Sequence, residues 1–425
     1  MDKRISSCFQ LIGFIATILM GCSETVTVPV QNEPPKAAFS FDPLAVQRGA
    51  NVMLSVSASD PDDDPLTVTW DVSRGTLNAN NQGKTVMPWQ APGVTGVDTI
   101  WVSVTDGTHT VSISTTIIVG YLWNSDINTN VTWNQSNSPV VISVDSTPPR
   151  VAIPEISSLF IEEGVVVYVQ AGLIFDVAGI LVTNGTSTNP VVFRPNSRAP
   201  EPGFWEGMVG STDPGSQVEP GSFQLHHTRI TYAAESVLLT SGASAELEEC
   251  QFYFSRDVAL HHDSGSGKLI VRNCQITDNN GDGIVVSSFS TKPDSVVIVG
   301  NKISLNGGNG IVLDLLDPFG VTPIQIVNNE ITRNIFYGIQ LIQASYPTIN
   351  QNSIHSNDRI QANGANRRNL RLEPGFIGTL PEIDASNNYW LSIDSLVIDQ
   401  TVFDSRDDAQ INTRVRFWPW LHIWP

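Results

Sequence analysis

The sequence predicts an all-β chain in which a β-sandwich precedes a right-handed parallel β-helix. One short pattern, an Asn or Cys followed two residues later by Ile or Phe, returns at intervals of 24, 27, 28 and 23 residues, which is the period of a solenoid. Short β-branched runs alternate with clusters of Asn, Gly, Asp and Ser, and no stretch of helical periodicity separates them. Before about residue 120, strand-like alternation occurs without this repeat.

Residues 1–21 have the features of a bacterial signal peptide. Lys3 and Arg4 precede an apolar run at residues 9–20, which is too short to span a bilayer as an anchor helix. The motif Leu-Met-Gly-Cys at residues 19–22 resembles the bacterial lipobox, and this resemblance implies that Cys22 is lipidated and starts the mature chain. Ordinary signal cleavage, which would leave Cys22 as a free thiol, is the alternative.

The segment after the lipobox predicts where the protein is held. Residues 22–34, with their Pro, Gln and Glu, are expected to form a tether. Ser23 after the cysteine favours, by the sorting rule that accompanies the lipobox resemblance, the bacterial outer membrane on its periplasmic or cell-surface face. Several acyl chains on one cysteine would hold the protein firmly, because each buried CH₂ contributes about 0.8 kcal/mol.

The chain is strongly acidic. It has 23 Lys and Arg against 42 Asp and Glu, a formal net charge of −19 at pH 7. Such a surface argues against nucleic acid and anionic lipid as partners, and it makes a strongly anionic polysaccharide a poor ligand unless cations bridge it. We therefore expect membrane contact through the N-terminal lipid, with a polysaccharide or a surface protein as the partner.

Residues 35–120 predict a small β-sandwich. Apolar and polar residues alternate in runs at 52–56, 66–70, 99–104 and 111–113. Trp70 is expected in the core between the two sheets. The run Ser-Ala-Ser-Asp-Pro-Asp-Asp-Asp-Pro-Leu-Thr at 57–67 and the motif Val-Thr-Asp-Gly at 104–107 resemble bacterial Ig-like domains of the PKD and cadherin-like kind.

The acidic run of the sandwich is a candidate calcium site. Asp60, Asp62 and Asp64 stand close together in sequence, and Asp106 belongs to the second motif. Carboxylate oxygens suit the hard Ca²⁺ ion, so these four residues are the predicted ligands if calcium binds. The alternative is an Asp-rich turn whose carboxylates satisfy their own backbone. The sequence predicts no other cofactor.

Residues 121–425 predict the β-helix with its C-terminal cap. Parallel strands stacked at roughly 4.8 Å per coil would bury one apolar column, with Leu260, Ile284, Ile311 and Ile339 facing inward. The repeat starts are Cys250, Cys274, Asn301, Asn329 and Asn352. The three asparagines would stack with their amides hydrogen-bonded from coil to coil.

Glycines and cysteines also fall at repeated positions. Gly283 and its equivalents Gly310 and Gly338 precede the inward Ile, where a turn is expected to swing tightly. Cys250 and Cys274 share one repeat position and should stack about one strand spacing apart. That distance permits a disulfide, but the parallel geometry favours buried free thiols.

Two long segments depart from the coil rhythm, at residues 195–220 and 361–380. Functional loops concentrate in such segments beside a rigid scaffold. The ends of the solenoid need covering, because an open end exposes apolar core and unpaired strand edges. The aromatic C-terminus is expected to fold over the last coil, and carbohydrate stacking is its alternative role: Phe417, Trp418, Trp420 and Trp424.

The whole of residues 121–425 resembles secreted bacterial right-handed parallel β-helix proteins of the pectate-lyase-like group, which carry parallel β-helix repeats. The first coils carry Gly-Leu-Ile-Phe at 172–175 and Gly-Phe-Trp-Glu-Gly at 203–207, and the last carry Asn-Asn-Tyr-Trp at 387–390 and Phe-Trp-Pro-Trp-Leu at 417–421. The resemblance implies the fold and leaves activity open, because this group holds both enzymes and surface proteins without assigned activity.

Candidate catalytic residues follow from the predicted alternation. With Leu260 inward, His261 and Asp263 face outward, and Asp314 joins them on the same sheet face. Polysaccharide enzymes of the resembling group place acids on such a face. The same columns contain Val285, Val312 and Ile342, so ordinary solvated surface is the competing interpretation.

Other charged residues add no recognisable enzyme motif. His262 is expected inward as a partnered core histidine. His226-His227 should lie near Glu248-Glu249 one coil later, which suggests local hydrogen bonding or a weak metal site. Arg229, Lys302 and Glu330 share a predicted outward column, without the acidic group that a lyase would use to hold calcium.

The sequence therefore favours a lipid-anchored surface protein that binds a glycan or surface partner without catalysis. The alternatives are a polysaccharide lyase or glycoside hydrolase of the β-helix fold, and a structural envelope protein.

Overall fold

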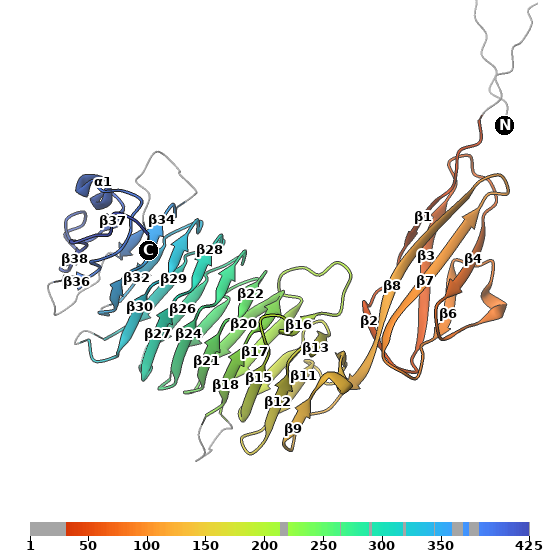
Figure 1. Ribbon diagram of the computed structural model, residues 1–425, viewed down its shortest axis with the longest axis horizontal. Coiled ribbons are helices and arrows are strands. Elements are labelled where there is room, and N and C mark those ends of the chain that lie inside the picture. Colours follow the sequence, from red (N-terminus) through yellow and green to blue (C-terminus); the bar gives the residue numbers. More distant parts are fainter. Residues whose placement is uncertain are drawn as a thin grey trace, which may run out of the picture. The chain divides into compact units, whose positions relative to one another are not determined.

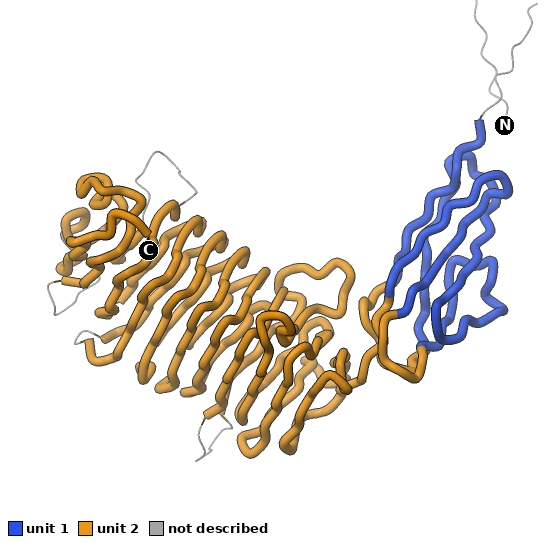
Figure 2. Tube along the Cα trace, viewed as in Figure 1, with its two compact units in different colours: residues 1–41, 51–91, 98–116 blue, residues 42–50, 92–97, 117–425 orange. Residues whose placement is uncertain are grey.

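The computed structural model describes residues 31–212, 220–263, 265–288, 291–317, 320–343, 345–358, 369–373 and 382–424. Figure 1 shows strands throughout this part of the chain. The predicted signal peptide and Cys22 lie outside the described residues. The chain divides into unit 1, residues 1–41, 51–91 and 98–116, and unit 2, residues 42–50, 92–97 and 117–425 (Figure 2).

Unit 1 is a sandwich of antiparallel strands. One sheet has the order β1-β3-β6-β5, and in the other β4 pairs with β7. The strands are β1 Lys36–Phe39, β3 Asn51–Ser59, β4 Thr67–Val72, β5 Thr76–Leu77, β6 Val86–Gln90, β7 Gly96–Thr105 and β8 Thr110–Trp123, with the 3₁₀ turn η1 Ala79–Asn81. The residues of β8 after 116 belong to unit 2, as does β2 Ala45–Gln47.

Two tryptophans fill the core of unit 1. Trp70 is 2% exposed and Trp89 is 1% exposed, so the predicted core position of Trp70 is confirmed. Both indole N–H groups donate to backbone carbonyls, Trp70 to Lys84 at 2.8 Å and Trp89 to Arg74 at 3.0 Å. Large aromatic rings are buried here without leaving a polar atom unsatisfied.

Unit 2 is a parallel β-helix built from three sheets (Figure 1). Sheet A contains β11 Arg150–Ile153, β14 Ile174–Val177, β17 Trp205–Gly210, β20 Ala233–Leu239, β23 Leu260–Asp263, β26 Ile284–Ser288, β29 Ile311–Leu315, β32 Ile339–Leu341, β35 Leu370–Leu372 and β37 Val402–Phe403.

Sheet B contains β9 Val131–Trp133, β12 Ser158–Glu162, β15 Ile180–Asn184, β18 Ser222–His226, β21 Ser244–Glu248, β24 Lys268–Arg272, β27 Ser295–Val299, β30 Ile324–Val327 and β33 Thr348–Asn350. Sheet C contains β10 Val140–Ile142, β13 Val166–Val169, β16 Val191–Pro195, β19 Thr228–Thr231, β22 Gln251–Tyr253, β25 Gln275–Thr277, β28 Lys302–Ser304, β31 Glu330–Thr332 and β34 Ser353–His355. The turn η2 Gln135–Asn137 precedes β10.

The predicted inward column is confirmed. Leu260, Ile284, Ile311 and Ile339 pair in register along sheet A and are at most 1% exposed. The early coils carry a core of large aromatic rings, with Phe193 packed on Phe175 and Trp205 at centroid distances of 6.1 and 6.5 Å. Later coils replace these rings with Ile, Val and Leu. An all-β chain with a sandwich followed by a parallel β-helix is therefore confirmed.

The repeated glycines are needed for a different reason from the predicted one. None of Gly283, Gly310 and Gly338 has a φ in the left-handed region. A Cβ added to Gly310 would instead lie 2.6 Å from the carbonyl oxygen of Gly338 and 2.8 Å from Cγ2 of Ile331. Close approach between coils, rather than a tight turn, requires glycine here.

The two long segments depart less from the coils than predicted, because part of each segment is regular β-helix. Strand β17 lies within residues 195–220 and β35 lies within 361–380, so each segment contains a regular strand of sheet A. The regular spacing of the coils could not be recognised in the sequence, because the connections around these two strands are long. Of these connections, residues 213–219, 361–368 and 374–380 lie outside the described residues.

The C-terminus covers the last coils. It includes the helix α1 Ser395–Asp399 and the paired strands β36 Glu382–Asp384 and β38 Arg414–Arg416. Phe417 and Trp420 pack against the core, as expected of a cap, whereas Trp418 is 63% exposed. Within the described ranges, no helix is long and apolar enough to cross a membrane.

The buried histidine of sheet A gives a pH prediction. His262 is 1% exposed, as expected, and its Nε2 lies 3.2 Å from the carbonyl oxygen of Gly267. Burial lowers the pKa of His262 below its ordinary value. The unfolded chain therefore binds this proton more readily, so the contribution of His262 to stability is present above a pH of about 6.5 and decreases as the pH falls below it.

Replacing His262 by leucine is expected to reduce the loss of melting temperature between about pH 7.5 and about pH 5.5. Leucine suits this position, because the register neighbours are Leu239 and Val286. Other titrating groups are common to both proteins, so the difference between their melting curves isolates His262. Equal losses in the two proteins would show that His262 is not a source of acid sensitivity.

Candidate functional site

The short strands of sheet C are held by unusual corners on both sides. In sheet C the strands β22, β25, β28, β31 and β34 have three residues each. Left-handed residues precede them at Glu249, Asn273, Gly300, Asn328 and Gln351, and follow them at Phe254, Asp278, Leu305, Arg333 and Ser356. Such φ values are uncommon outside glycine, so other interactions must stabilise these corners.

A ladder of buried amides provides this stabilisation at the first corner. The backbone N and the Nδ2 of Asn301 donate to Oδ1 of Asn329 at 2.8 and 3.0 Å, and Asn329 donates likewise to Asn352 at 2.9 Å each. Asn352 continues the ladder to Asn388. The predicted stacking of Asn301, Asn329 and Asn352 is confirmed.

The two cysteines begin this ladder as free thiols. Both Cys250 and Cys274 are buried and unpaired by a disulfide, so the disulfide alternative is wrong and the favoured thiols are confirmed. The thiol of Cys250 donates to the carbonyl of Leu225 at 3.2 Å, and the backbone N of Cys274 donates to Oδ1 of Asn301 at 2.8 Å. Burial raises the pKa of the Cys274 thiol well above its ordinary value, which makes it unreactive.

A second ladder at the other corner was not predicted. Asn279, Asn306, Asn334 and Asn357 repeat the arrangement, with Nδ2-to-Oδ1 distances of 2.9 Å. Each member follows a member of the first ladder by five residues. That constant spacing is the sequence signal that would have revealed it.

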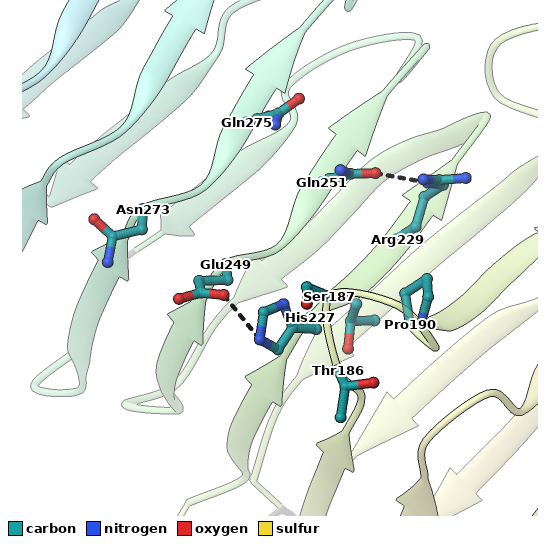
Figure 3. Close-up of a pocket in the computed structure, with 10 residues that line it drawn as sticks. Thr186, Ser187, Pro190, His227, Arg229, Glu249, Gln251, Asn273 and Gln275 are labelled. Atoms are coloured by element: carbon teal, nitrogen blue, oxygen red, sulfur yellow. Dashed lines mark hydrogen bonds and ion pairs between the residues drawn. The ribbon is translucent and has the colours of Figure 1, made fainter.

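A polar hollow lies on the outer face of sheet C (Figure 3), and we call it the sheet C pocket. Its volume is about 290 Å³. The lining comes from a loop and three successive coils: Thr186, Ser187, Pro190, His227, Thr228, Arg229, Glu249, Gln251, Asn273 and Gln275. The loop lies between β15 and β16, and Thr186 N donates to the Asn189 carbonyl at 3.1 Å to close it.

One register column runs through the pocket. Arg229 pairs with Gln251, Gln251 with Gln275, Gln275 with Lys302 and Lys302 with Glu330. The predicted outward column that joins the two basic residues to Glu330 is therefore confirmed. Nε of Arg229 donates to Oε1 of Gln251 at 2.7 Å (Figure 3).

An aromatic group borders the column. The hydroxyl of Tyr253 donates to Oε1 of Gln275 at 2.7 Å, and burial raises the pKa of Tyr253. Tyr232 and Phe254 stack at a centroid distance of 4.9 Å, and Phe254 is 39% exposed. Planar polar groups and exposed rings thus lie beside each other on successive coils.

The charges of the pocket nearly cancel. Nε2 of His227 lies 2.8 Å from a carboxylate oxygen of Glu249 (Figure 3), and Nδ1 of His226 lies 3.2 Å from Glu248 beside the pocket. The sequence predicted this neighbourhood of His226-His227 and Glu248-Glu249. Arg229 adds one positive charge to the lining. A site of this kind suits a neutral, hydrogen-bonding ligand.

The predicted catalytic residues lie elsewhere, on the outer face of sheet A. His261 and Asp263 are both on β23, and Ser287 on β26 pairs in register with Asp263 and with Asp314. Ser287 donates to Asp263 at 3.2 Å, and Gln343 donates to Asp314 at 2.7 Å. The three candidates therefore share one face, as predicted, but an acidic pair in direct contact is not formed.

Two of the four proposed calcium ligands, Asp60 and Asp106, accept hydrogen bonds from the backbone of their own turns. Oδ1 of Asp60 accepts the backbone N–H groups of Asp62 and Asp64 at 2.9 and 3.2 Å. Asp106 accepts from the backbone of His109 and Thr108, which together lower its pKa. Within the described part of the chain, no group of three or more His, Cys, Asp or Glu side chains is arranged to hold a metal ion. The Asp-rich turn is the arrangement present.

Comparison with known proteins identifies both modules. Residues 32–119 match the family model of a bacterial Ig domain, and residues 215–354 match the model of a right handed beta helix region. No significant match was found among the curated proteins or among the solved structures. The chain thus consists of a bacterial Ig domain followed by a right-handed β-helix.

Proposed function

We propose that this protein is a cell-surface module that binds a neutral polysaccharide along the outer face of sheet C. The observation that carries the proposal is the register column of Arg229, Gln251 and Gln275, which places one planar hydrogen-bonding side chain on each coil. Successive members are about 4.8 Å apart, so an extended polymer along the solenoid axis meets a similar group at each step.

The hydrogen-bonding capacity of the column supports this role. Within the described ranges, the Nε2 amides of Gln251 and Gln275 donate no hydrogen bond to another residue, while their Oε1 atoms accept from Arg229 and Tyr253. The internal bonds fix the side-chain planes and leave amide donors for sugar hydroxyls. Pre-ordered donors reduce the entropy cost of binding.

Aromatic surface next to the column completes the arrangement. The stacked pair of Tyr232 and Phe254 offers an apolar ring face, and sugars present apolar C–H faces together with hydroxyls. Binding sites commonly combine a few placed polar groups with aromatic walls. The overall charge of −19 disfavours uronate-rich polymers, so the proposed ligand is neutral.

Lipidation at Cys22 would hold this binding surface at the outer membrane. The lipobox resemblance of residues 19–22 supports the anchor, and the bacterial Ig domain is typical of extracellular proteins. The Ig domain would then stand between the lipid and the β-helix in the chain.

Replacing Gln275 by alanine is expected to weaken binding of a neutral polysaccharide roughly tenfold, because one or two hydrogen bonds of about 1 kcal/mol are lost. Gln275 is exposed, so folding should be unaffected. Gln325→Ala is the matched control, since Gln325 is an exposed glutamine on sheet B. Affinity electrophoresis of the full chain measures both variants, and equal affinities would rule out the column as the binding surface.

A further inference from the structure

Three polar side chains from successive coils form a relay on the outer face of sheet A. Oε1 of Glu235 on β20 lies 3.3 Å from Nδ1 of His261 on β23. Nε2 of the same ring lies 3.3 Å from Oγ of Ser287 on β26. The imidazole therefore joins a carboxylate at one nitrogen and a hydroxyl at the other, which is the connectivity of an acid–histidine–serine triad.

A β-bulge places Glu235 in this relay. On β17, Gly207 pairs with Glu235 but the next residue, Met208, pairs with Val237, so Ser236 is an extra residue on β20. Both Ser236 and Val237 are buried, and Glu235 is thereby turned to the outer face. Bulges often re-aim a side chain beside an active site.

The backbone partner of Glu235 allows this bulge. Gly207 has φ +108, and a Cβ at this position would lie 1.7 Å from the carbonyl oxygen of Glu235. A residue with a side chain would displace the bulged strand. The second carboxylate oxygen of Glu235 is buried and has no hydrogen-bond partner among the described residues, a costly arrangement that calls for an explanation.

We propose that Ser287 and His261 form a catalytic pair for hydrolysis of carboxylic esters with short acyl groups, with Glu235 as the residue that positions the imidazole. This activity goes beyond glycan binding and uses another sheet. His261 and Glu235 are 20% and 22% exposed, so the relay is shielded but reachable from solvent.

The chemistry requires only the ester and water. Oγ of Ser287 attacks the ester carbonyl carbon while its proton passes to Nε2 of His261. Collapse of the tetrahedral adduct breaks the bond to the alcohol oxygen, which takes that proton from His261 and leaves an acyl-serine. Water then attacks the acyl-serine with His261 again as base, releasing the carboxylic acid and restoring Ser287. Glu235 holds Nδ1–H and stabilises the imidazolium.

Asp263 sets the resting position of the nucleophile. Its Oδ1 lies 3.2 Å from Oγ of Ser287, so the hydroxyl has two acceptors, Asp263 and Nε2 of His261. Rotation about one side-chain bond moves the proton between them. The relay is therefore one rotation from the attacking geometry.

Neighbouring side chains define the substrate class. Leu238 and Val285 share the register column of His261, are partly exposed and provide an apolar strip beside Ser287, whereas Val312 of the same column is buried. Such a strip accepts a short acyl chain. Asp263 and Asp314 on either side of Ser287 in register disfavour a negatively charged ester. Neutral acetyl or similarly short esters fit both features.

Labelling with a fluorophosphonate, followed by mass spectrometry, tests the nucleophile in the full chain. The expected result is one phosphonyl adduct on Ser287 and hydrolysis of 4-nitrophenyl acetate that falls at least about 100-fold in Ser287→Ala and in His261→Gln. Ser295→Ala, which changes a serine on sheet B, is the control and should keep both properties. Absence of an adduct on Ser287, or equal hydrolysis by wild type and Ser287→Ala, would overturn the proposal.

The role of Glu235 has its own readout. Glu235→Gln removes the negative charge beside the imidazole, so the imidazolium is less stable and the acid limb of the labelling rate should move to lower pH. The labelling rate itself should fall. A lower rate with an unchanged pH profile would show that Glu235 contributes only to folding.

Discussion

Replacing Asn329 by alanine is expected to destabilise the β-helix by about 3–5 kcal/mol, since each buried polar group left without a partner costs about 1–3 kcal/mol. Oδ1 of Asn329 accepts two N–H groups of Asn301, and its Nδ2 donates to the carbonyl of Ile298 at 2.8 Å. Alanine removes all of these side-chain bonds at a position that is fully buried. Water cannot replace them without entering the core.

The midpoint of urea unfolding, followed by circular dichroism of the full chain, measures this loss. Asn280→Ala is the matched control, because Asn280 is exposed and has an ordinary φ. The control should change the unfolding free energy by no more than about 0.5 kcal/mol. A loss in Asn329→Ala no larger than in the control would show that the ladder does not stabilise the solenoid.

Gly310→Ala is expected to destabilise the β-helix by about 3 kcal/mol, at the upper end of typical overpacking costs. The new Cβ would lie 2.6 Å from the carbonyl oxygen of Gly338, 2.8 Å from Cγ2 of Ile331 and 2.9 Å from Nδ2 of Asn334. Two of these three neighbours are fixed, one in the backbone and one in the amide ladder. The coil that contains Gly310 can accommodate the methyl group only by moving away from the following coil.

The control for this substitution is Gly93→Ala. Gly93 has an ordinary φ and no atom within 4 Å of the added Cβ, so alanine should be neutral or slightly stabilising. Thermal melting of both variants compares the two glycines directly. A Gly310→Ala protein that melts within about 1 °C of Gly93→Ala would mean that the coils are not as closely packed as the structure has them.

The solenoid could be predicted from the sequence because each coil needs the same residue types at the same positions. Asn301, Asn329 and Asn352 mark one corner, and an inward Ile follows at a fixed interval. The cysteines were recognised as ladder members for the same reason, since they occupy the same repeat position. A side chain whose environment recurs from coil to coil is predictable even without homologous sequences.

The second ladder shows how a recurring feature was still missed. Asn279, Asn306 and Asn334 repeat with the same periods as the first ladder, five residues later. They lie among turn residues rich in Gly, Asp and Ser, where an asparagine is ordinarily explained by local turn chemistry. Only the hydrogen bonds between coils distinguish a ladder from a turn.

The outward columns of both proposed surfaces follow the repeat and were predicted in part, whereas two of their features depend on departures from the repeat and were not predicted. Glu235 faces outward only because Ser236 is inserted as a bulge, whereas strict alternation from Val237 would turn Glu235 inward. One side of the sheet C pocket, with Thr186, Ser187 and Pro190, is the loop between β15 and β16. Neither the bulge nor the loop recurs from coil to coil, so neither could be predicted from the spacing of residues.

Co-elution of the full chain with polysaccharides on a sizing column shows whether the outer face of sheet C binds a neutral glycan. We expect a neutral polymer to elute with the protein at unchanged polymer length and a uronate-rich polymer not to do so. Arg229→Ala and Gln275→Ala together should abolish the co-elution. Removal of ester groups at Ser287 would leave the polymer length unchanged and so would not interfere. Co-elution that survives the double substitution, preference for the acidic polymer, or shortening of the neutral polymer would contradict a neutral-glycan binding surface on sheet C.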